Sequence, residues 1–122
     1  MWARCSIGQV LAGTACTGEA LRLPLAAARS AAAEVNARGE LFFNDWRLPT
    51  LPELASIAER ECVQPRTNLD IFPGTRPSPY WTSTAQPGGK AGVSYSLDFG
   101  AGGVRLDDDR ESNHVRLVRR AR

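Results

Sequence analysis

The chain has 122 residues, of which 43% are hydrophobic and 23% are charged, and its formal net charge is +2. This length fits one domain with its own core, and the near-neutral balance excludes the strongly basic surface that is typical of nucleic-acid-binding domains. No apolar stretch approaches the roughly 20 residues of a membrane-spanning helix. We therefore expect residues 1–122 to form a single domain without a membrane span, and nucleic acid is not an expected partner.

A glycine-containing loop follows a predicted short strand at residues 2–4 and is bracketed by Cys5 and Cys16. Two cysteines that enclose such a loop favour a disulfide, which would stabilise the fold by about 2–3 kcal/mol. Two reduced thiols in a cytoplasmic protein are the alternative. Cys62 is then left without a partner. The paired short ligand spacings of a zinc site are absent, so we expect neither a metal nor a cofactor.

Two helices are expected in the first half of the chain. Residues 24–38 are alanine-rich and place apolar side chains at helical spacing, with a proline in the first turn and Gly39 as the stop signal. Thr50 and Glu53 stand three residues apart, which is the spacing of a capping box. The second helix is therefore predicted at residues 51–60.

The second half predicts an antiparallel sheet after a long irregular connection at residues 62–79, which holds four prolines. Alternating patterns indicate strands at residues 80–84, 92–99, 104–107 and 114–118. Two helices followed by an antiparallel meander give an α+β fold class.

Several landmarks occur in a fixed order along the chain. They are Met1-Trp2, Arg4-Cys5, Cys16-Thr17-Gly18, Asp45-Trp46-Arg47-Leu48-Pro49-Thr50, Tyr80-Trp81-Thr82-Ser83 and Val115-Arg116-Leu117-Val118-Arg119. This order closely resembles the family named after the C-terminal domain of the Legionella collagen-like adhesin, over essentially the whole chain. The resemblance implies a C-type-lectin-like fold, in which two helices precede a twisted antiparallel sheet and the chain ends pair. Members usually begin with a strand that leads into Gly-Leu-Met-Trp, so we expect either that a piece of strand upstream of Met1 is missing here or that the gene starts late.

The same resemblance implies a function. The adhesin's domain binds sulfated glycosaminoglycans on a trimeric stalk, and other members are lipoproteins, exported proteins or the variable proteins of diversity-generating retroelements. We therefore expect a non-enzymatic binding or adhesion domain outside the cytoplasm, with a polyanionic glycan or a protein as its ligand. A retroelement-diversified variable protein and a structural domain that forms homo-oligomers are the alternatives.

The segment Trp46-Arg47-Leu48-Pro49-Thr50 invites a functional interpretation, with a tryptophan that stacks on sugar and an arginine that binds an anion. Chain geometry explains it as well, because a buried Trp, an Arg on backbone carbonyls and a Pro beside a cap all belong to a helix start. We assign to the scaffold Trp46, Arg47, Pro49, Thr50, Glu53 and Trp81.

The ligand surface is expected on the sheet and loops of residues 80–114. Neighbouring residues of a strand face opposite ways, so a core position for Trp81 leaves Tyr80 for the ligand. A patch for sulfated polymers is suggested by Arg116, Arg119, Arg120 and Arg122, with Arg105 and Arg110 on neighbouring strands. Edge charges paired with Asp107–Asp109 are the alternative. The candidate ligand residues are Tyr80, Ser83, Tyr95, Arg105, Arg110, Asn113, His114 and Arg116.

The sequence gives weaker support for three other kinds of site, namely a calcium loop, an acidic cation site and a catalytic pair. Gln86-Pro87-Gly88 lacks the third ligand of a lectin calcium loop. The run Asp107–Asp109, with Asp98, is more typical of a solvated turn than of a cation site. A catalytic pair of Cys62 and His114 would need proximity that the sequence does not indicate, so we expect no enzymatic activity.

Overall fold

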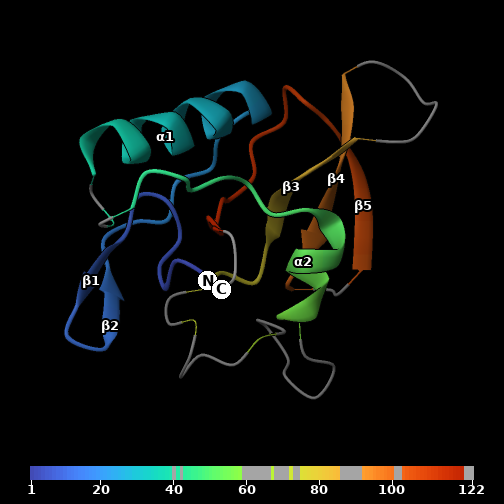
Figure 1. Cartoon of the computed structure of the whole chain (residues 1–122). Helices are drawn as coiled ribbons and strands as arrows, with labels where there is room; N and C mark the ends of the chain where they lie inside the picture. Colours follow the sequence, from blue (N-terminus) through green and yellow to red (C-terminus); the bar gives the residue numbers. More distant parts are fainter. Residues whose placement is uncertain are drawn as a thin grey trace.

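Strands β3 (Pro79–Ala85), β4 (Val93–Asp98) and β5 (Gly103–Asp108) form an antiparallel sheet in that order (Figure 1). The computed structural model describes residues 1–39, 41, 43–58, 67, 72, 75–85, 92–100 and 103–119. All three strands lie within one residue of their predicted bounds. In β4 the sequence Val-Ser-Tyr-Ser-Leu-Asp alternates larger and small or polar side chains, the period of two that defines a strand.

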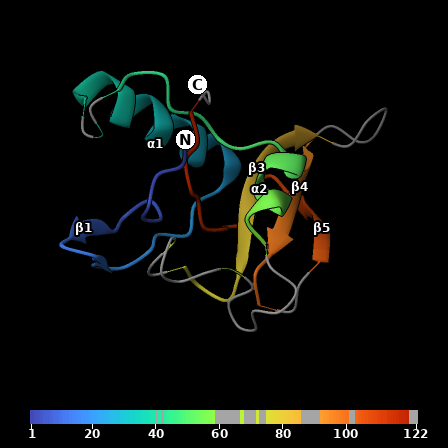
Figure 2. The same ribbon diagram turned by 60° about the horizontal axis from the view of Figure 1, so that its bottom comes forward.

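A separate two-stranded hairpin consists of β1 (Val10–Ala12) and β2 (Ala15–Thr17), and Cys16 lies in β2. The predicted disulfide is confirmed, with a Cα–Cα distance of 5.6 Å. The hairpin itself was not predicted, because three-residue strands are too short for a recognisable alternation. In Figures 1 and 2 it projects away from the three-stranded sheet.

Helix α1 (Leu25–Arg38) confirms the first predicted helix to within one residue. Its buried stripe consists of Leu25, Ala28, Ala32 and Val35, the residues whose spacing predicted it. Gly39 ends the helix with φ 64°, a left-handed conformation that glycine adopts without steric cost. No helix in the described part of the chain is long and apolar enough to cross a membrane.

Helix α2 (Leu51–Ser56) is shorter than the predicted 51–60. The amide of Ile57 donates to the Leu54 carbonyl at 3.2 Å, an i to i−3 bond that tightens the last turn. The Ile57 carbonyl then accepts the Thr67 hydroxyl at 2.6 Å. This hydroxyl satisfies a carbonyl at the end of α2, one of the groups that a helix leaves without an intrahelical partner.

The predicted strand at residues 114–118 is wrong. Residues 113–118 are all buried, and their backbone pairs in turn with several different segments rather than with one strand. Leu23 pairs with Asn113, Tyr80 with His114, and both Trp2 and Arg47 with Val118. The pairing of Trp2 with Val118 brings the two chain ends together, as the family resemblance implied.

Two hydrophobic clusters pack around the three-stranded sheet. One lies under α1 and includes Trp46, Trp81 and Leu117. The other lies under α2, which crosses β3 and β4 in Figure 2, and includes Tyr80 and Leu97. Because each face of β3 meets its own cluster, Tyr80 and Trp81 are both buried, with 1% and 0% of their surface exposed.

Candidate binding face

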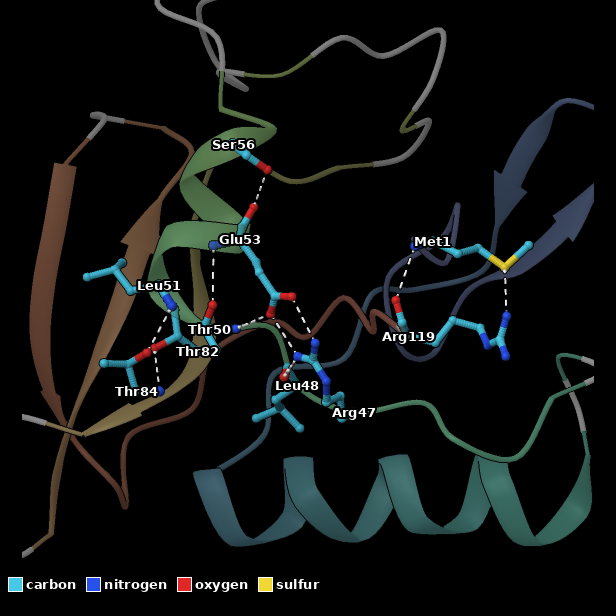
Figure 3. Close-up of polar contacts among 10 residues, drawn as sticks. All are labelled: Met1, Arg47, Leu48, Thr50, Leu51, Glu53, Ser56, Thr82, Thr84 and Arg119. Carbon is cyan, nitrogen blue, oxygen red and sulfur yellow. Dashed lines mark hydrogen bonds and ion pairs between the residues drawn. The ribbon is translucent and has the colours of Figure 1, made fainter. Parts of the chain in front are cut away.

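The helix start at residues 47–53 is a closed polar network (Figure 3). Glu53 accepts two bonds from the Arg47 guanidinium, at 2.7 and 2.8 Å, and a third from the amide of Thr50 at 2.8 Å. The Thr50 hydroxyl in turn accepts the Glu53 amide at 3.3 Å, which confirms the capping box. The bond from Arg47 is the main reason that the pKa of Glu53 falls from 4.5 to about 2. The amide of Leu51 donates to the Thr84 hydroxyl, which fixes this corner to β3.

The two scaffold tryptophans lie in the core. Trp46 is 6% exposed, and its backbone amide and carbonyl bond the side chain of Asn36 at 2.8 Å each. The Trp81 indole donates to the Leu23 carbonyl at 2.6 Å. Pro49 is also buried. Neither indole ring offers a free face on which a sugar could stack.

Four of the predicted ligand residues are buried and do not lie on the surface: Tyr80, Asn113, His114 and Arg116. The Tyr80 hydroxyl lies 2.6 Å from the Ser6 hydroxyl and accepts the Arg76 amide at 3.1 Å. The expectation that Tyr80 faces a ligand is therefore wrong, because its polar group is engaged inside the protein.

His114 packs its ring on Tyr80, with ring centroids 5.3 Å apart. Its Nδ1 lies 3.1 Å from the Leu21 carbonyl. Burial lowers the pKa of His114, and the positive charges of Arg22 and Arg76 lower it further, although the Leu21 carbonyl opposes them. The imidazole is thus buried in the protein.

Arg116 joins the two ends of the chain. One guanidinium nitrogen donates to the carbonyls of Ala3, at 2.9 Å, and Arg4, while the other donates to the Thr75 hydroxyl at 2.6 Å. The guanidinium also lies 5.1 Å from the centre of the Phe72 ring. The expectation that Arg116 belongs to a surface patch is wrong, because only 1% of it is exposed.

The other arginines of the predicted patch that the structure describes pair with carboxylates. Arg105 bonds Asp107 at 3.2 Å, and Arg110 bonds Asp108 at 3.0 Å. The second pair lowers the pKa of Asp108 from 3.8 to about 2. These contacts match the alternative in which edge charges are neutralised locally.

Arg119 is paired as well. It bonds Asp45 at 2.7 Å and lies 3.7 Å from the centre of the Phe43 ring. Figure 3 shows it beside Met1, whose amino group donates to the Arg119 carbonyl at 3.1 Å. Arg120, Arg122, Cys62 and the segment Gln86-Pro87-Gly88 lie outside the described residues.

Asp107 is not part of a solvated turn, because only 2% of it is exposed. Besides Arg105, it accepts the Ser96 hydroxyl at 2.6 Å and the Asn113 amide at 3.0 Å. The residues that the structure describes contain no group of three or more side chains placed to hold a metal ion. Sequence reasoning missed this buried carboxylate, because its partners come from three different segments.

Strands β4 and β5 carry an exposed apolar surface. It lies on the same face of the sheet as α2, next to the part that α2 covers. There Tyr95 stands opposite Leu106, and Leu97 stands opposite Val104. Leu97 is covered by the α2 cluster, whereas Val104 and Leu106 are 53% and 46% exposed. Val93, Tyr95, Val104 and Leu106 are named here the β4–β5 face.

Of the predicted ligand residues, Tyr95 alone belongs to the β4–β5 face. Ser83 is exposed on β3, and its amide donates to the Pro49 carbonyl. The alternation of Val104 and Leu106 in the sequence was a usable signal for this face. It was interpreted only as strand periodicity, since nothing in it reveals where α2 ends.

Comparison with known sequences identifies the family. The chain matches the Lcl C-terminal domain family over residues 1–119. Comparison with curated proteins gives no match.

Proposed function

Because this chain belongs to the Lcl C-terminal domain family, we propose that it is a non-enzymatic ligand-binding domain of an exported or surface protein. Membership points to a surface or adhesin-associated domain. The ligand itself must be inferred from the surface, since a fold alone does not specify one.

The observation that carries this proposal is the β4–β5 face. Two aliphatic side chains, Val104 and Leu106, stay about half exposed on the face of the sheet where the α2 cluster covers Tyr80 and Leu97. Exposed apolar side chains that adjoin one another mark interaction sites more often than isolated ones do. Tyr95 adds an aromatic ring with a hydroxyl, a side chain that is common in binding surfaces.

The surface rests on a rigid support. The capping box and the Arg47–Glu53 pair hold α2, and the bond from Leu51 to Thr84 holds that helix on β3. A ligand would therefore meet side chains that are already in position, which lowers the entropic cost of binding.

The location outside the cytoplasm has two supports. The family is adhesin-related, and the Cys5–Cys16 disulfide is of the kind that persists in oxidising compartments. A C-type-lectin-like fold is also part of this proposal. It is supported by the order of two helices before an antiparallel sheet and by the paired chain ends.

The burial of His114 supports a binding function without catalysis. A general base must come within hydrogen-bonding reach of its substrate. The His114 ring is enclosed by Tyr80 and the Leu21 carbonyl.

Sulfated glycans are the ligand class to test first, because the family resemblance implies them. Among the predicted arginines, Arg110 keeps 91% of its side chain exposed and lies just beyond β5. We expect retention on immobilised heparin at higher salt than on a neutral dextran matrix. Elution at the same salt from both matrices would exclude a polyanionic ligand and leave an uncharged glycan or a protein.

The role of the β4–β5 face is tested with a matched pair of double variants against a panel of sulfated and neutral glycans and matrix proteins. Val104→Ser with Leu106→Ser alters the face. Val10→Ser with Leu21→Ser removes the same two residue types from exposed positions elsewhere. We expect the first double variant to lose binding at least about tenfold and the second to bind like the wild type. Equal binding by both would place the site elsewhere.

A further inference from the structure

Strand β5 has an open edge. It is the last strand of the sheet, paired on one side with β4, and no other described strand lies beside it. Both views show its outer side facing away from the molecule (Figures 1 and 2). An edge strand presents unpaired amide and carbonyl groups, to which another strand can add.

The register shows which backbone groups point outward. The amide of Asp109 donates to the carbonyl of Gly92 at 2.8 Å, one position beyond the pairing of Val93 with Asp108. In an antiparallel pair, hydrogen-bonded positions alternate along the strand. Gly103, Arg105 and Asp107 therefore direct their backbone groups toward β4, and Val104 and Leu106 direct theirs outward. Asp108 also points outward, but its carbonyl already accepts the amide of Glu111 at 2.8 Å. The Tyr95 carbonyl agrees with this pattern, because it points toward β3 and accepts the Thr82 hydroxyl at 2.7 Å.

We propose that the open edge of β5 pairs with β5 of a second copy of this chain, antiparallel about a twofold axis at Leu106. The inference concerns the assembly of the domain and does not depend on the ligand proposed above. A twofold contact is self-complementary, so the charges along one strand decide whether it can form.

Charge complementarity selects this register over its two neighbours. Outward-pointing residues must meet outward-pointing residues, so the axis can pass through position 105, 106 or 107. An axis at Arg105 places two arginines directly opposite each other, and an axis at Asp107 does the same with two carboxylates. Like charges in directly opposite positions are destabilising. The axis at Leu106 avoids both arrangements, because Arg105 of each copy lies opposite Asp107 of the other. Asp107 stays buried and keeps its bonds to Arg105, Ser96 and Asn113 of its own chain.

The same register also brings apolar side chains of the two copies together. Leu106 meets Leu106 of the second copy, so a leucine that is 46% exposed in one chain gains an apolar neighbour on the same face of the sheet. Val104 of each copy lies beside the Asp108 backbone of the other. The pairing would join two β4–β5 faces into one continuous surface across six strands.

Substitution of Leu106 tests the pairing by sedimentation velocity over a dilution series. Leu106→Lys places two ammonium groups opposite each other at the axis. Leu21→Lys is the matched control, because Leu21 is also 46% exposed but lies outside the sheet. We expect a concentration-dependent dimer for the wild type and for Leu21→Lys, and a dimer dissociation constant raised about tenfold or more for Leu106→Lys. A wild type that stays monomeric up to millimolar concentration, or a Leu106→Lys dimer of unchanged affinity, would overturn the proposal.

Cysteine cross-linking tests the register and remains informative if the lysine variant folds poorly. Hydrogen-bonded partners in an antiparallel pair lie about 5.5 Å apart at Cα, within the range of a disulfide. In a Cys62→Ser background, Leu106→Cys should give a disulfide-linked dimer under mild oxidation. Val104→Cys should not, because its two copies would lie about 14 Å apart along the strands. Linkage at Val104, or none at Leu106, would refute this register. Because the readout is mass, the result does not depend on whether any ligand binds.

Discussion

The tripeptide Val-Arg-Leu occurs twice in the second half of the chain, at residues 104–106 and 115–117. In the first copy, Val104 and Leu106 are 53% and 46% exposed, and the arginine pairs with a carboxylate two residues away. In the second copy, the three residues are 0–1% exposed, and the arginine donates to backbone carbonyls at the other end of the chain. Neighbouring structure decides between these outcomes, since the local sequence is the same.

The two segments therefore have different roles, since residues 115–117 support the fold and residues 104–106 form part of the surface. Residues 115–117 lie between the N-terminal segment and the core, and they belong to the block that resembles the family. Residues 104–106 lie at the edge of the sheet and belong to no such block. The residues that identify the family thus hold the fold, while the surface that we propose for binding carries no recognisable motif.

The largest difference in stability between the two segments should appear when their arginines, Arg116 and Arg105, are replaced. Arg116→Ala removes three hydrogen bonds and the contact with Phe72, and we expect it to lower the free energy of unfolding by about 3–5 kcal/mol. Arg105→Ala should cost about 1 kcal/mol, because its side chain is 48% exposed and the buried Asp107 keeps its bonds from Ser96 and Asn113. Urea denaturation of both variants measures the difference. Equal losses would mean that Arg116 is not the internal link described here.

Replacement of the two leucines, Leu117 and Leu106, should give a smaller difference in the free energy of unfolding. Leu117→Ala leaves a cavity in the α1 cluster and should cost about 2–4 kcal/mol. Leu106→Ala should cost less than about 0.5 kcal/mol when it is measured at a protein concentration low enough to keep the chain monomeric. A Leu106 variant as unstable as the Leu117 variant would show that the β5 edge is covered in solution.

The buried segment should also respond to pH where the exposed one does not. Burial lowers the pKa of His114 below its ordinary 6.5, so the unfolded chain takes up a proton before the folded one does. Stability should therefore be constant above about pH 6.5 and fall as the pH drops below it. The contribution of the Arg110–Asp108 pair, near the exposed segment, to stability changes only between pH 3.8 and about 2, where Asp108 takes up a proton. Thermal melting between pH 8 and 5 measures the effect, and His114→Asn is the control in which this slope should disappear.

The sequence predicts those features of the structure that depend on residues close together in the chain, and it misses those that depend on distant segments. The helix at 25–38, the capping box at Thr50 and the disulfide depend on residues close together in the chain, and all three were predictable. Tyr80 and Arg116 were placed on the surface because strand alternation assumes one covered face. Here both sides of those segments are covered by parts of the chain far away in sequence, and no local pattern reports that.

The smallest predicted effect concerns the two valines. Thr is nearly the same shape as Val, so the substitution changes polarity and leaves the volume almost unaltered. Val115→Thr places a hydroxyl in a fully buried site and should cost about 1–3 kcal/mol unless it finds a partner. Val104→Thr should change stability by less than about 0.5 kcal/mol, because water solvates the hydroxyl and threonine suits a strand. If calorimetry instead finds the Val104 variant clearly destabilised, that side chain is covered by another part of the chain or by a second molecule. The β4–β5 face would then be an interior surface and not a binding face.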